Sequence, residues 1–504
     1  MPGNFFQAIA ETAAARPEAP FLILPGRGPL DYRATLAIAA RFAQVLTARG
    51  VMPGDRIMAQ TGKSAEAICL YIACLAIGAV YVPLNTGYTP SEIAYFAGDA
   101  EPKIFVCAPE SRDRIAAVAP GAAILTLGDD GGEGSLLEEA ADRPPEFPRA
   151  AVGMEDLASI LYTSGTTGRS KGAMLSHGNL WSNAETLKDI WRYSAGDVLL
   201  HALPIFHIHG LFVATNVSLV AGAAMILLPK FEVSEMFRWL PQASVMMGVP
   251  TFYTRLLQDP RLTPEAARHM RLFISGSAPL LADTHRQWRA RSGHAILERY
   301  GMTETGMIAS NPYDGARVPG TVGYALPGVS VRVADEAGRA LAPDTVGMIE
   351  VRGPNVFQGY WRMPERTREE IRGDGYFITG DLGVMEADGR LSIVGRGKDL
   401  IITGGFNVYP KEIESLIDAL DGVEESAVIG LAHPDFGEGV TAVVVRKNGA
   451  SLNEADVLTA LSEHLARFKL PKRVLFVEDL PRNTMGKVQK AALREQYRDL
   501  YGNG

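Results

Sequence analysis

The sequence predicts an α/β protein with a large N-terminal domain of doubly wound sheets, a small β-rich subdomain and a smaller, mobile α+β domain at the C-terminus. Its 504 residues exceed what one hydrophobic core supports, so several cores are expected. Short apolar strands alternate with helical stretches, which is typical of a sheet covered on both faces. These strands are expected at 104–107, 123–125, 224–228 and 245–249.

The N-terminal half supports this fold class element by element. Residues 4–50 predict a helix, a short strand and a second helix. The uncharged segment 67–84 reaches the lower limit of about 18 apolar residues for a membrane span. Gly78 divides this segment, so we expect a buried helix followed by a buried strand, without membrane insertion. Segment 128–149 is rich in Gly, Asp, Glu and Pro and is expected to be an exposed connector outside the core.

The C-terminal half has a different pattern. Strands separated by turns predict the β-rich subdomain at about 313–396. Beyond Asp399 helices and strands are mixed, as in a compact α+β unit. Glycines around Arg396 and Lys398 make this the natural joint. We therefore expect an N-terminal domain of residues 1–396 and a C-terminal domain of residues 397–504.

Bulk composition excludes several classes of protein. The net charge of −8 and the pI near 5.7 give no basic surface for nucleic acid. Residues 1–15 lack the pattern of a secretory signal. Cys69, Cys74 and Cys107 have neither CxxC spacing nor a nearby histidine pair, which favours reduced, buried thiols in a cytoplasmic protein.

The strongest chemical signal is the sequence YTSGTTGRSKG at 162–172, directly after an apolar strand. Glycines let backbone N–H groups turn towards an anion, hydroxyls add donors, and Lys171 adds a charge near the terminal phosphates. The spacing differs from the ordinary P-loop GxxxxGK[ST], and a plain surface turn is the alternative. The predicted ATP-binding residues of this loop are Thr163, Ser164, Gly165, Thr166, Thr167, Gly168 and Lys171.

This loop resembles the signature of the acyl-adenylate-forming family, which includes acyl-CoA synthetases, nonribosomal-peptide adenylation domains and firefly-type luciferases. Further motifs similar to those of the family follow in the family's order and cover nearly the whole chain. They lie at 276–280, 298–304, 376–381, 395–399 and 481–487. The resemblance implies ATP-dependent activation of a carboxylic acid as an acyl adenylate, with Mg²⁺ required and coenzyme A as the thiol substrate.

The resemblance also assigns roles. Asp381 is expected to accept hydrogen bonds from the ribose hydroxyls, assisted by Arg396. Thr303 is expected to hydrogen-bond the α-phosphate, Glu304 to hold Mg²⁺, and Lys487 to stabilise the charge that develops during adenylation. A solvated surface lysine is the alternative for Lys487. The remaining nucleotide-binding residues, which include the expected adenine slot, are Gly276, Ser277, Ala278, Glu298, Arg299, Tyr300, Gly301 and Met302.

The second half-reaction, thioester formation, needs a different arrangement of the same site. In relatives the C-terminal domain swings about a joint that aligns with Lys398, and we expect this motion here. It would carry Gly404, Gly405 and Phe406 towards the acyl adenylate and coenzyme A. Acetylation of Lys487 by a lysine acetyltransferase would remove its charge and is expected to block adenylation.

The acid should be selected near His207 and His209. His207 is expected to orient the carboxylate or to guard the thiol channel, and a buried structural histidine is the alternative. Segments 249–255, 275–280 and 310–315 are similar to malonyl-CoA synthetases, which implies malonate or methylmalonate. A second buried carboxylate requires a cation, and Arg286 is the first candidate, with Arg255 in reserve. Ser275 and Gly276 are expected to line the same pocket.

One segment departs from this resemblance, because 306–309 is less polar than expected of a malonate enzyme. Three alternatives therefore stay open. The chain could activate another short or medium acid, it could be a free-standing adenylation domain that loads a carrier protein, or it could be a nucleotide sensor without turnover.

Overall fold

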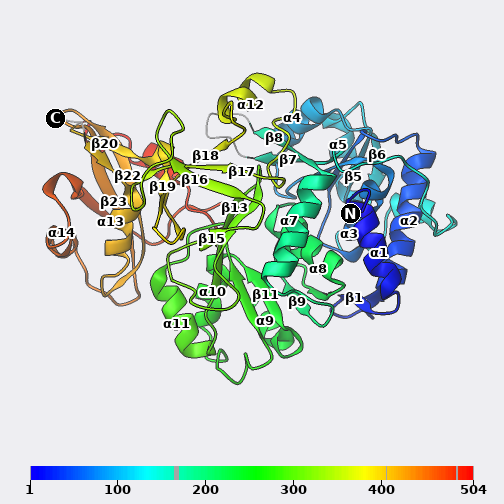
Figure 1. Ribbon diagram of the computed structural model, residues 1–504, viewed down its shortest axis with the longest axis horizontal. Coiled ribbons are helices and arrows are strands. Elements are labelled where there is room, and N and C mark those ends of the chain that lie inside the picture. The colour runs from blue at the N-terminus through cyan, green and yellow to red at the C-terminus, as the bar shows by residue number, and fades with distance from the viewer. Residues whose placement is uncertain (1, 164–169, 405, 484–485, 503–504) are drawn as a thin grey trace.

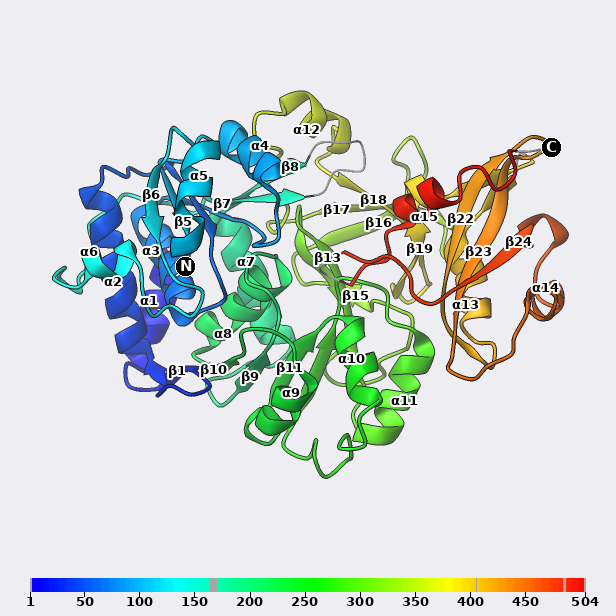
Figure 2. The ribbon, with the colours of Figure 1, turned by 180° about the vertical axis from the view of Figure 1, so that it is seen from behind.

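The structure is a computed structural model that describes residues 2–163, 170–404, 406–483 and 486–502. It is a mixed α/β protein with two large sheets in the N-terminal part and two smaller sheets after them (Figures 1 and 2). The predicted fold class is confirmed. The helices are α1 (Phe5–Ala15), α2 (Tyr32–Ala48), α3 (Ala65–Ile77), α4 (Pro90–Ala100), α5 (Arg112–Val118), α6 (Ser135–Ala140), α7 (His177–Ile190), α8 (Asn216–Ala221), α9 (Val233–Trp239), α10 (Pro250–Leu257), α11 (Ala282–Ser292), α12 (Pro364–Glu370), α13 (Pro410–Ile417), α14 (Glu454–Ser462) and α15 (Lys490–Gln496).

The first large sheet has six strands in the order β6-β5-β3-β4-β7-β8. All neighbours are parallel except β7 and β8, which form an antiparallel pair. Parallel neighbours need crossover connections, and helices supply them. The strands are β3 (Arg56–Gln60), β4 (Val80–Pro83), β5 (Ile104–Cys107), β6 (Ala123–Thr126), β7 (Leu157–Thr163) and β8 (Lys171–Ser176).

The second large sheet has nine strands in the order β15-β14-β13-β12-β11-β9-β10-β1-β2. Its centre, from β13 to β1, is parallel, and the strands at both edges are antiparallel. The strands are β1 (Pro20–Ile23), β2 (Leu30–Asp31), β9 (Val198–His201), β10 (Ala224–Leu227), β11 (Val245–Gly248), β12 (Leu272–Ser275), β13 (Leu297–Met302), β14 (Gly306–Ser310) and β15 (Tyr324–Ala325). The central strands are buried, which explains their continuous apolar sequences.

Helix α3 contains most of the uncharged segment that reaches the lower length limit for a membrane span. Every residue of α3 is buried, and the helix runs into the buried strand β4, as predicted. Ser64 accepts a hydrogen bond from the first turn, and Gly78 ends the helix in the left-handed conformation, with φ +70°. None of the helices in the described residues is long and apolar enough to cross a membrane. The cysteines are likewise buried and unpaired.

The prediction for segment 128–149 is partly wrong. This segment contains α6, and its Leu136 and Ala140 are buried in the main core. These two residues are four apart and so share one face of the helix, which packs on α2. The helix is too short to show periodicity among the surrounding polar residues, and tertiary contact decides its conformation.

A four-stranded antiparallel sheet follows, in the order β16-β17-β18-β19. Its strands are β16 (Ser330–Ala334), β17 (Gly347–Arg352), β18 (Phe377–Met385) and β19 (Leu391–Arg396). Glu350 is fully buried in this sheet and lies 2.7 Å from the guanidinium nitrogens of both Arg332 and Arg372. This double pairing satisfies a carboxylate that would otherwise be costly to bury.

The last sheet has five strands and its own apolar clusters. Its order is β21-β20-β23-β22, with β24 beside β23. Figures 1 and 2 show these strands in yellow to red at one end of the molecule, and α13 packs against β19. The strands are β20 (Ile401–Thr403), β21 (Phe406–Val408), β22 (Val423–His433), β23 (Gly437–Arg446) and β24 (Arg473–Val477).

The packing of Gly78 against Val152 and Pro53 at the end of α3 can be tested by substitution. Gly78→Ala places a Cβ 2.7 Å from Val152 and 3.2 Å from Pro53, in a left-handed conformation. Gly54→Ala is the matched control, because Gly54 also has positive φ but has no atom near its added Cβ. Both variants lose about 1–2 kcal/mol of folding stability, because alanine is disfavoured in the left-handed conformation. The clash adds about 1 kcal/mol or more for Gly78→Ala.

We therefore expect Gly78→Ala to lower the Tm by about 1–2 °C more than Gly54→Ala does, because the entropy of unfolding of so long a chain is large. Thermal unfolding of the two variants under identical conditions measures the difference. Equal Tm values would contradict the tight packing of Gly78 against Val152.

Candidate functional site

Strands β7 and β8 carry the predicted phosphate loop at their open end. Thr163 ends β7 directly opposite Lys171, which begins β8. The Thr163 hydroxyl donates to the carbonyl oxygen of Lys171 at 3.4 Å. The sheet therefore fixes both ends of the predicted loop. Ser164, Gly165, Thr166, Thr167 and Gly168 lie outside the described residues.

The ammonium of Lys171 lies in a polar cluster with Tyr360 and Glu370. Its Nζ is 3.0 Å from Glu370 Oε1 and 4.0 Å from the centre of the Tyr360 ring. The Tyr360 hydroxyl lies 2.5 Å from Glu370 Oε2 and 3.1 Å from Glu304 Oε1. Burial raises the pKa of Glu304 above its usual value. The loop lysine and the predicted magnesium ligand thus share one network, and the motifs gave no signal for Tyr360 or Glu370.

Asp381 is the centre of a second cluster, where β18 of the four-stranded sheet meets β13 of the nine-stranded sheet. The hydroxyl of Tyr300 on β13 donates to Asp381 Oδ2 at 2.6 Å. Arg396 faces Asp381 across the β18–β19 pair, with its Nε 2.7 Å from Oδ1. The ring, the carboxylate and the cation that the sequence placed around adenine and ribose are therefore brought together.

The turn after β12 separates this cluster from a deeper pocket. Ser277 has φ +73°, which is uncommon for a residue other than glycine and occurs where surrounding contacts fix the backbone. Its hydroxyl lies 3.1 Å from His209 Nδ1. A Cβ on Gly276 would lie 2.4 Å from Arg299 Cζ, so only glycine leaves room for the guanidinium. Ala278 follows in the same turn.

The remaining nucleotide motif runs along β13 and into its turn. Burial raises the pKa of Glu298 to about 8, and its carboxylate accepts a backbone N–H at 3.2 Å. A Cβ on Gly301 would come within 2.2 Å of a backbone oxygen of β14. Met302 ends the strand, and Thr303 begins the turn that leads to Glu304. The motif therefore connects the predicted nucleotide site with the predicted magnesium ligand.

Lys487 reaches this site from the C-terminal part of the chain. A Cβ on the preceding Gly486 would lie 3.2 Å from Thr251, at the start of α10, so this segment touches the N-terminal body. Burial, with Arg396 nearby, lowers the pKa of Lys487 to about 8, and the charge of Asp381 acts in the opposite direction. The predicted catalytic lysine is therefore partly buried and lies near residues of the predicted nucleotide site.

Arg299 is the cation of a buried polar cluster behind the Gly276 turn, and this cluster is called the Arg299 pocket below. It is only 4% exposed, and its Nε and Nη2 have no hydrogen-bond partner among the described residues. Burial lowers the pKa of Arg299 to about 9. His207 Nδ1, His209 Nε2 and Ser275 Oγ are also buried without partners in this part of the chain. A buried guanidinium without an anion is costly, so this pocket fits an anionic ligand.

The two histidines of this pocket are neutral. Burial lowers the pKa of His207 to about 3, and it lowers the pKa of His209 well below its usual value. The positive charge of Arg299 adds to both effects. Neutral imidazoles beside a cation donate or accept hydrogen bonds without adding charge.

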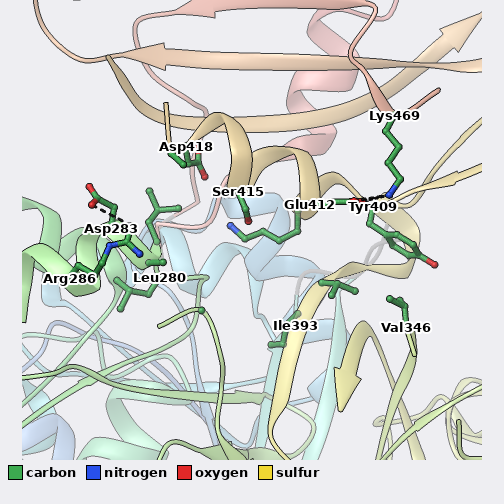
Figure 3. A pocket seen from close by; sticks show the side chains of 16 residues that line it. Leu280, Asp283, Arg286, Val346, Ile393, Tyr409, Glu412, Ser415, Asp418 and Lys469 are labelled. Carbon is green, nitrogen blue, oxygen red and sulfur yellow. Dashed lines mark hydrogen bonds and ion pairs between the residues drawn. The ribbon is translucent and has the colours of Figure 1, made fainter. Parts of the chain in front are cut away.

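Arg286, the sequence's first candidate for the second carboxylate, lies elsewhere. It is on α11 with its side chain 63% exposed, 3.6 Å from Asp283. Figure 3 shows it at the wall of a different cavity, of about 500 Å³, between α11 and α13. The reserve candidate, Arg255, is exposed at the end of α10. The placement of Arg286 in a buried acid site is therefore wrong, because the side chain is exposed; the buried arginine near His207 and His209 is Arg299, which the sequence had grouped with the ATP motif.

The predicted hinge and thioester residues lie close together in the chain, at the start of the C-terminal domain. Lys398 is in the 3-10 turn Gly397–Asp399, between β19 and β20. Gly404 has φ +57° at the tip of the β20–β21 hairpin, and Gly405 is outside the described residues. Phe406 is 55% exposed and stacks on Phe468 at 4.7 Å. Lys487 thus faces the nucleotide site while this hairpin faces solvent.

Comparison with known proteins agrees with this geometry. The sequence profile of the AMP-binding enzyme family matches residues 9–361, and that of the AMP-binding enzyme C-terminal domain matches residues 412–487. The ATP-bound structure of MatB from Rhodopseudomonas palustris is 61% identical, with a TM-score of 0.97, and covers 99% of this chain and 100% of that one. The apo structure of the same protein has a TM-score of 0.87 at the same identity and coverage.

A curated relative extends the comparison to mammals. The mitochondrial malonate–CoA ligase ACSF3 of Mus musculus is 37% identical over 466 residues, which cover 85% of this chain and 78% of that protein. The family profiles span both the body that contains Arg299 and the segment that contains Lys487. The chain belongs to the AMP-binding enzyme family.

Proposed function

We propose that the chain is an AMP-forming acid–CoA ligase that joins malonate to coenzyme A. The observation that carries this proposal is the buried guanidinium of Arg299, whose Nε and Nη2 have no hydrogen-bond partner among the described residues, close to the neutral imidazoles of His207 and His209. Malonate has a second carboxylate that would pair with this guanidinium, preferably in a bidentate way. The mouse relative is named as a malonate–CoA ligase, which supports the same acid.

Other substrates are less compatible with this pocket. Methylmalonate keeps both carboxylates and stays as the nearest alternative. A monocarboxylate would leave Arg299 without an anion, which is costly for a buried charge. Met307, Ile308 and Ala309, the apolar departure from the malonate resemblance, are fully buried in β14. A carrier-protein thiol instead of coenzyme A remains the second candidate for the acceptor.

The first step is attack of a malonate carboxylate oxygen on the α-phosphorus of ATP. An oxygen–phosphorus bond forms, the bond to the β-phosphate oxygen breaks, and pyrophosphate leaves. The Lys487 ammonium would neutralise the negative charge that builds up on the attacked phosphate. Thr303 would hydrogen-bond the same phosphate, Lys171 would hold the terminal phosphates, and Asp381 would hold the ribose.

Magnesium is implied by this chemistry, and the residues present fit it. Glu304 offers a buried carboxylate that accepts a hydrogen bond from the Tyr360 hydroxyl at 3.1 Å. No group of three or more His, Cys, Asp or Glu side chains in the described residues could hold a metal ion. A single carboxylate such as that of Glu304 suits Mg²⁺, because Mg²⁺ binds through one or two carboxylates together with substrate phosphates and water. When bound, the ion would neutralise part of the phosphate charge.

The second step needs the C-terminal domain to move. The coenzyme A sulfur attacks the acyl carbonyl carbon, and AMP leaves with the bond to the phosphate oxygen broken. Lys487 is partly buried and close enough to Arg396 and Asp381 for both charges to affect its pKa, which supports a role in the first step. We propose that residues 397–504 rotate against 1–396 at Lys398, and that Gly404 and Phe406 then approach the adenylate. The same motion would expose Lys487 to a lysine acetyltransferase, whose product would lack the charge for adenylation.

The proposed acid is tested with a panel of carboxylic acids, ATP, Mg²⁺ and coenzyme A, measured by AMP release and thioester mass. Arg299→Met removes the cation and keeps the bulk. We expect kcat/KM for malonate to fall by about 100- to 1,000-fold, because the second carboxylate of malonate loses its cationic partner. Propionate turnover should change little.

Arg286→Met is the matched control and should behave as the unsubstituted protein, since Arg286 is exposed. The Kd for ATP of Arg299→Met should also be unchanged. Equal losses for malonate and propionate, or a weakened Kd for ATP, would return Arg299 to the nucleotide site and contradict its role in acid recognition.

Lys487 predicts an alkaline limit for adenylation. Its pKa is lowered to about 8, and only the ammonium form can neutralise the developing charge. The kcat/KM of the first half-reaction, measured by ATP–pyrophosphate exchange, should therefore fall as pH rises through about 8. Lys487→Arg keeps its charge at every accessible pH, so its residual activity should lack this limb. A flat profile to pH 10 in the unsubstituted protein would contradict the assignment.

Lys398 predicts a separation of the two half-reactions. Proline fixes φ and removes a backbone donor, so Lys398→Pro should restrict rotation at the joint. We expect ATP–pyrophosphate exchange to be retained within about threefold and thioester formation to fall by about 100-fold or more. Lys398→Ala is the control for loss of the side chain. Parallel loss of both half-reactions would argue against a hinge at this position.

A further inference from the structure

Glu370 is a carboxylate that the adenylation chemistry does not require. It is the last residue of α12 and lies 3.0 Å from the Nζ of Lys171, the lysine predicted to hold the terminal phosphates. Both side chains are largely buried, at 16% and 14% exposed. A carboxylate here repels the phosphates that Lys171 is there to attract.

The surrounding backbone fixes Glu370 in this position. Tyr360 forms a bridge with Ala173 of β8, so its ring stands beside Lys171. The backbone N–H of Tyr360 donates to the Thr367 hydroxyl at 2.9 Å, which ties α12 to the same place. The Tyr360 hydroxyl then holds Glu370 at 2.5 Å. Helix α12 and the end of β8 thus form one rigid unit.

The Glu370 carboxylate is also paired within its own helix. Arg366 lies one turn earlier and its Nη2 is 2.6 Å from Glu370 Oε1. Glu370 therefore keeps a cationic partner when Lys171 moves to the phosphates. Exchange of Lys171 between a carboxylate and a phosphate leaves no unpaired charge in either state.

We infer that Glu370 is a positioning residue that competes with the β- and γ-phosphates for Lys171, and so weakens the hold on pyrophosphate as it leaves. It keeps the lysine in place before ATP binds and takes it back after the first half-reaction. Its effect acts through Lys171 and is confined to ligands that contain the terminal phosphates.

The test measures binding rather than turnover, with α,β-methylene-ATP and with AMP, both in the presence of Mg²⁺. Glu370→Gln keeps the shape and the hydrogen bond from Tyr360 but removes the charge. We expect its Kd for α,β-methylene-ATP to fall by roughly three- to tenfold. Its Kd for AMP should be unchanged, because AMP has no terminal phosphates.

Two further variants show whether the effect passes through Lys171. Glu369→Gln is the matched control, since Glu369 is 62% exposed and pairs only with Arg366 in the described part of the chain. It should change neither Kd. In a Lys171→Met background, Glu370→Gln should no longer tighten α,β-methylene-ATP, as expected of a coupled pair.

An unchanged or raised Kd of Glu370→Gln for α,β-methylene-ATP would overturn the inference, as would an equal change for AMP. Persistence of the full effect in the Lys171→Met background would show repulsion that bypasses the lysine, and would also overturn it. The inference rests on ATP use by this site. Failure of the unsubstituted protein to bind either nucleotide would instead refute the proposed function.

Discussion

The unpaired guanidinium of Arg299 is the feature around which the acyl side of the site is arranged. Gly276 has no side chain because the guanidinium occupies the space where a Cβ would stand. His207 and His209 are held neutral partly by its charge, and Lys487 is close enough for its own pKa to be affected. A protein that gathers cations in this way gains stability from an anion, since each positive charge raises the cost of the next.

The same gathering of positive charges explains the arrangement of the two domains. Lys487 lies beside Arg396 in the nucleotide site, and each cation disfavours the other's charge. Asp381 and Glu304 offset this only in part. Negative phosphate oxygens would complete the balance, so nucleotide binding favours the arrangement in which the C-terminal segment is docked. The higher TM-score with the ATP-bound relative than with its apo form is consistent with this arrangement.

The sequence predicted the fold class and the nucleotide site because both depend on local patterns. Apolar strands between helices define the sheets. Arg396 faces Asp381 across the β18–β19 pair, and the Tyr300 hydroxyl reaches Asp381 from β13 of the nine-stranded sheet. The acyl pocket could not be located in this way. Arg286 follows the Gly276 turn in the chain, but α11 directs it to solvent, whereas Arg299 is on a buried strand.

A signal for Arg299 was present in the sequence but was assigned to another role. An arginine in a strand with buried neighbours on both sides is unusual, since arginine is rarely buried unless paired. Its place in the ATP motif concealed this. Glu370 gave no signal at all, because a glutamate in a charged helix is ordinarily solvated. Only the bridge between Tyr360 and β8 brings it to Lys171.

Arg299 and Lys171 show how one site can treat two anions in opposite ways. The acid must stay bound through both half-reactions, and the cation proposed to receive it has no hydrogen-bond partner at Nε or Nη2 in the described residues. Pyrophosphate must leave between them, and the lysine that receives it already has Glu370 as a partner. The acid would be retained because Nε and Nη2 of Arg299 have no other partner in the described residues. Pyrophosphate would be released because Lys171 can pair with Glu370 instead. The difference lies in the protein's own carboxylates, since both cations are largely removed from water.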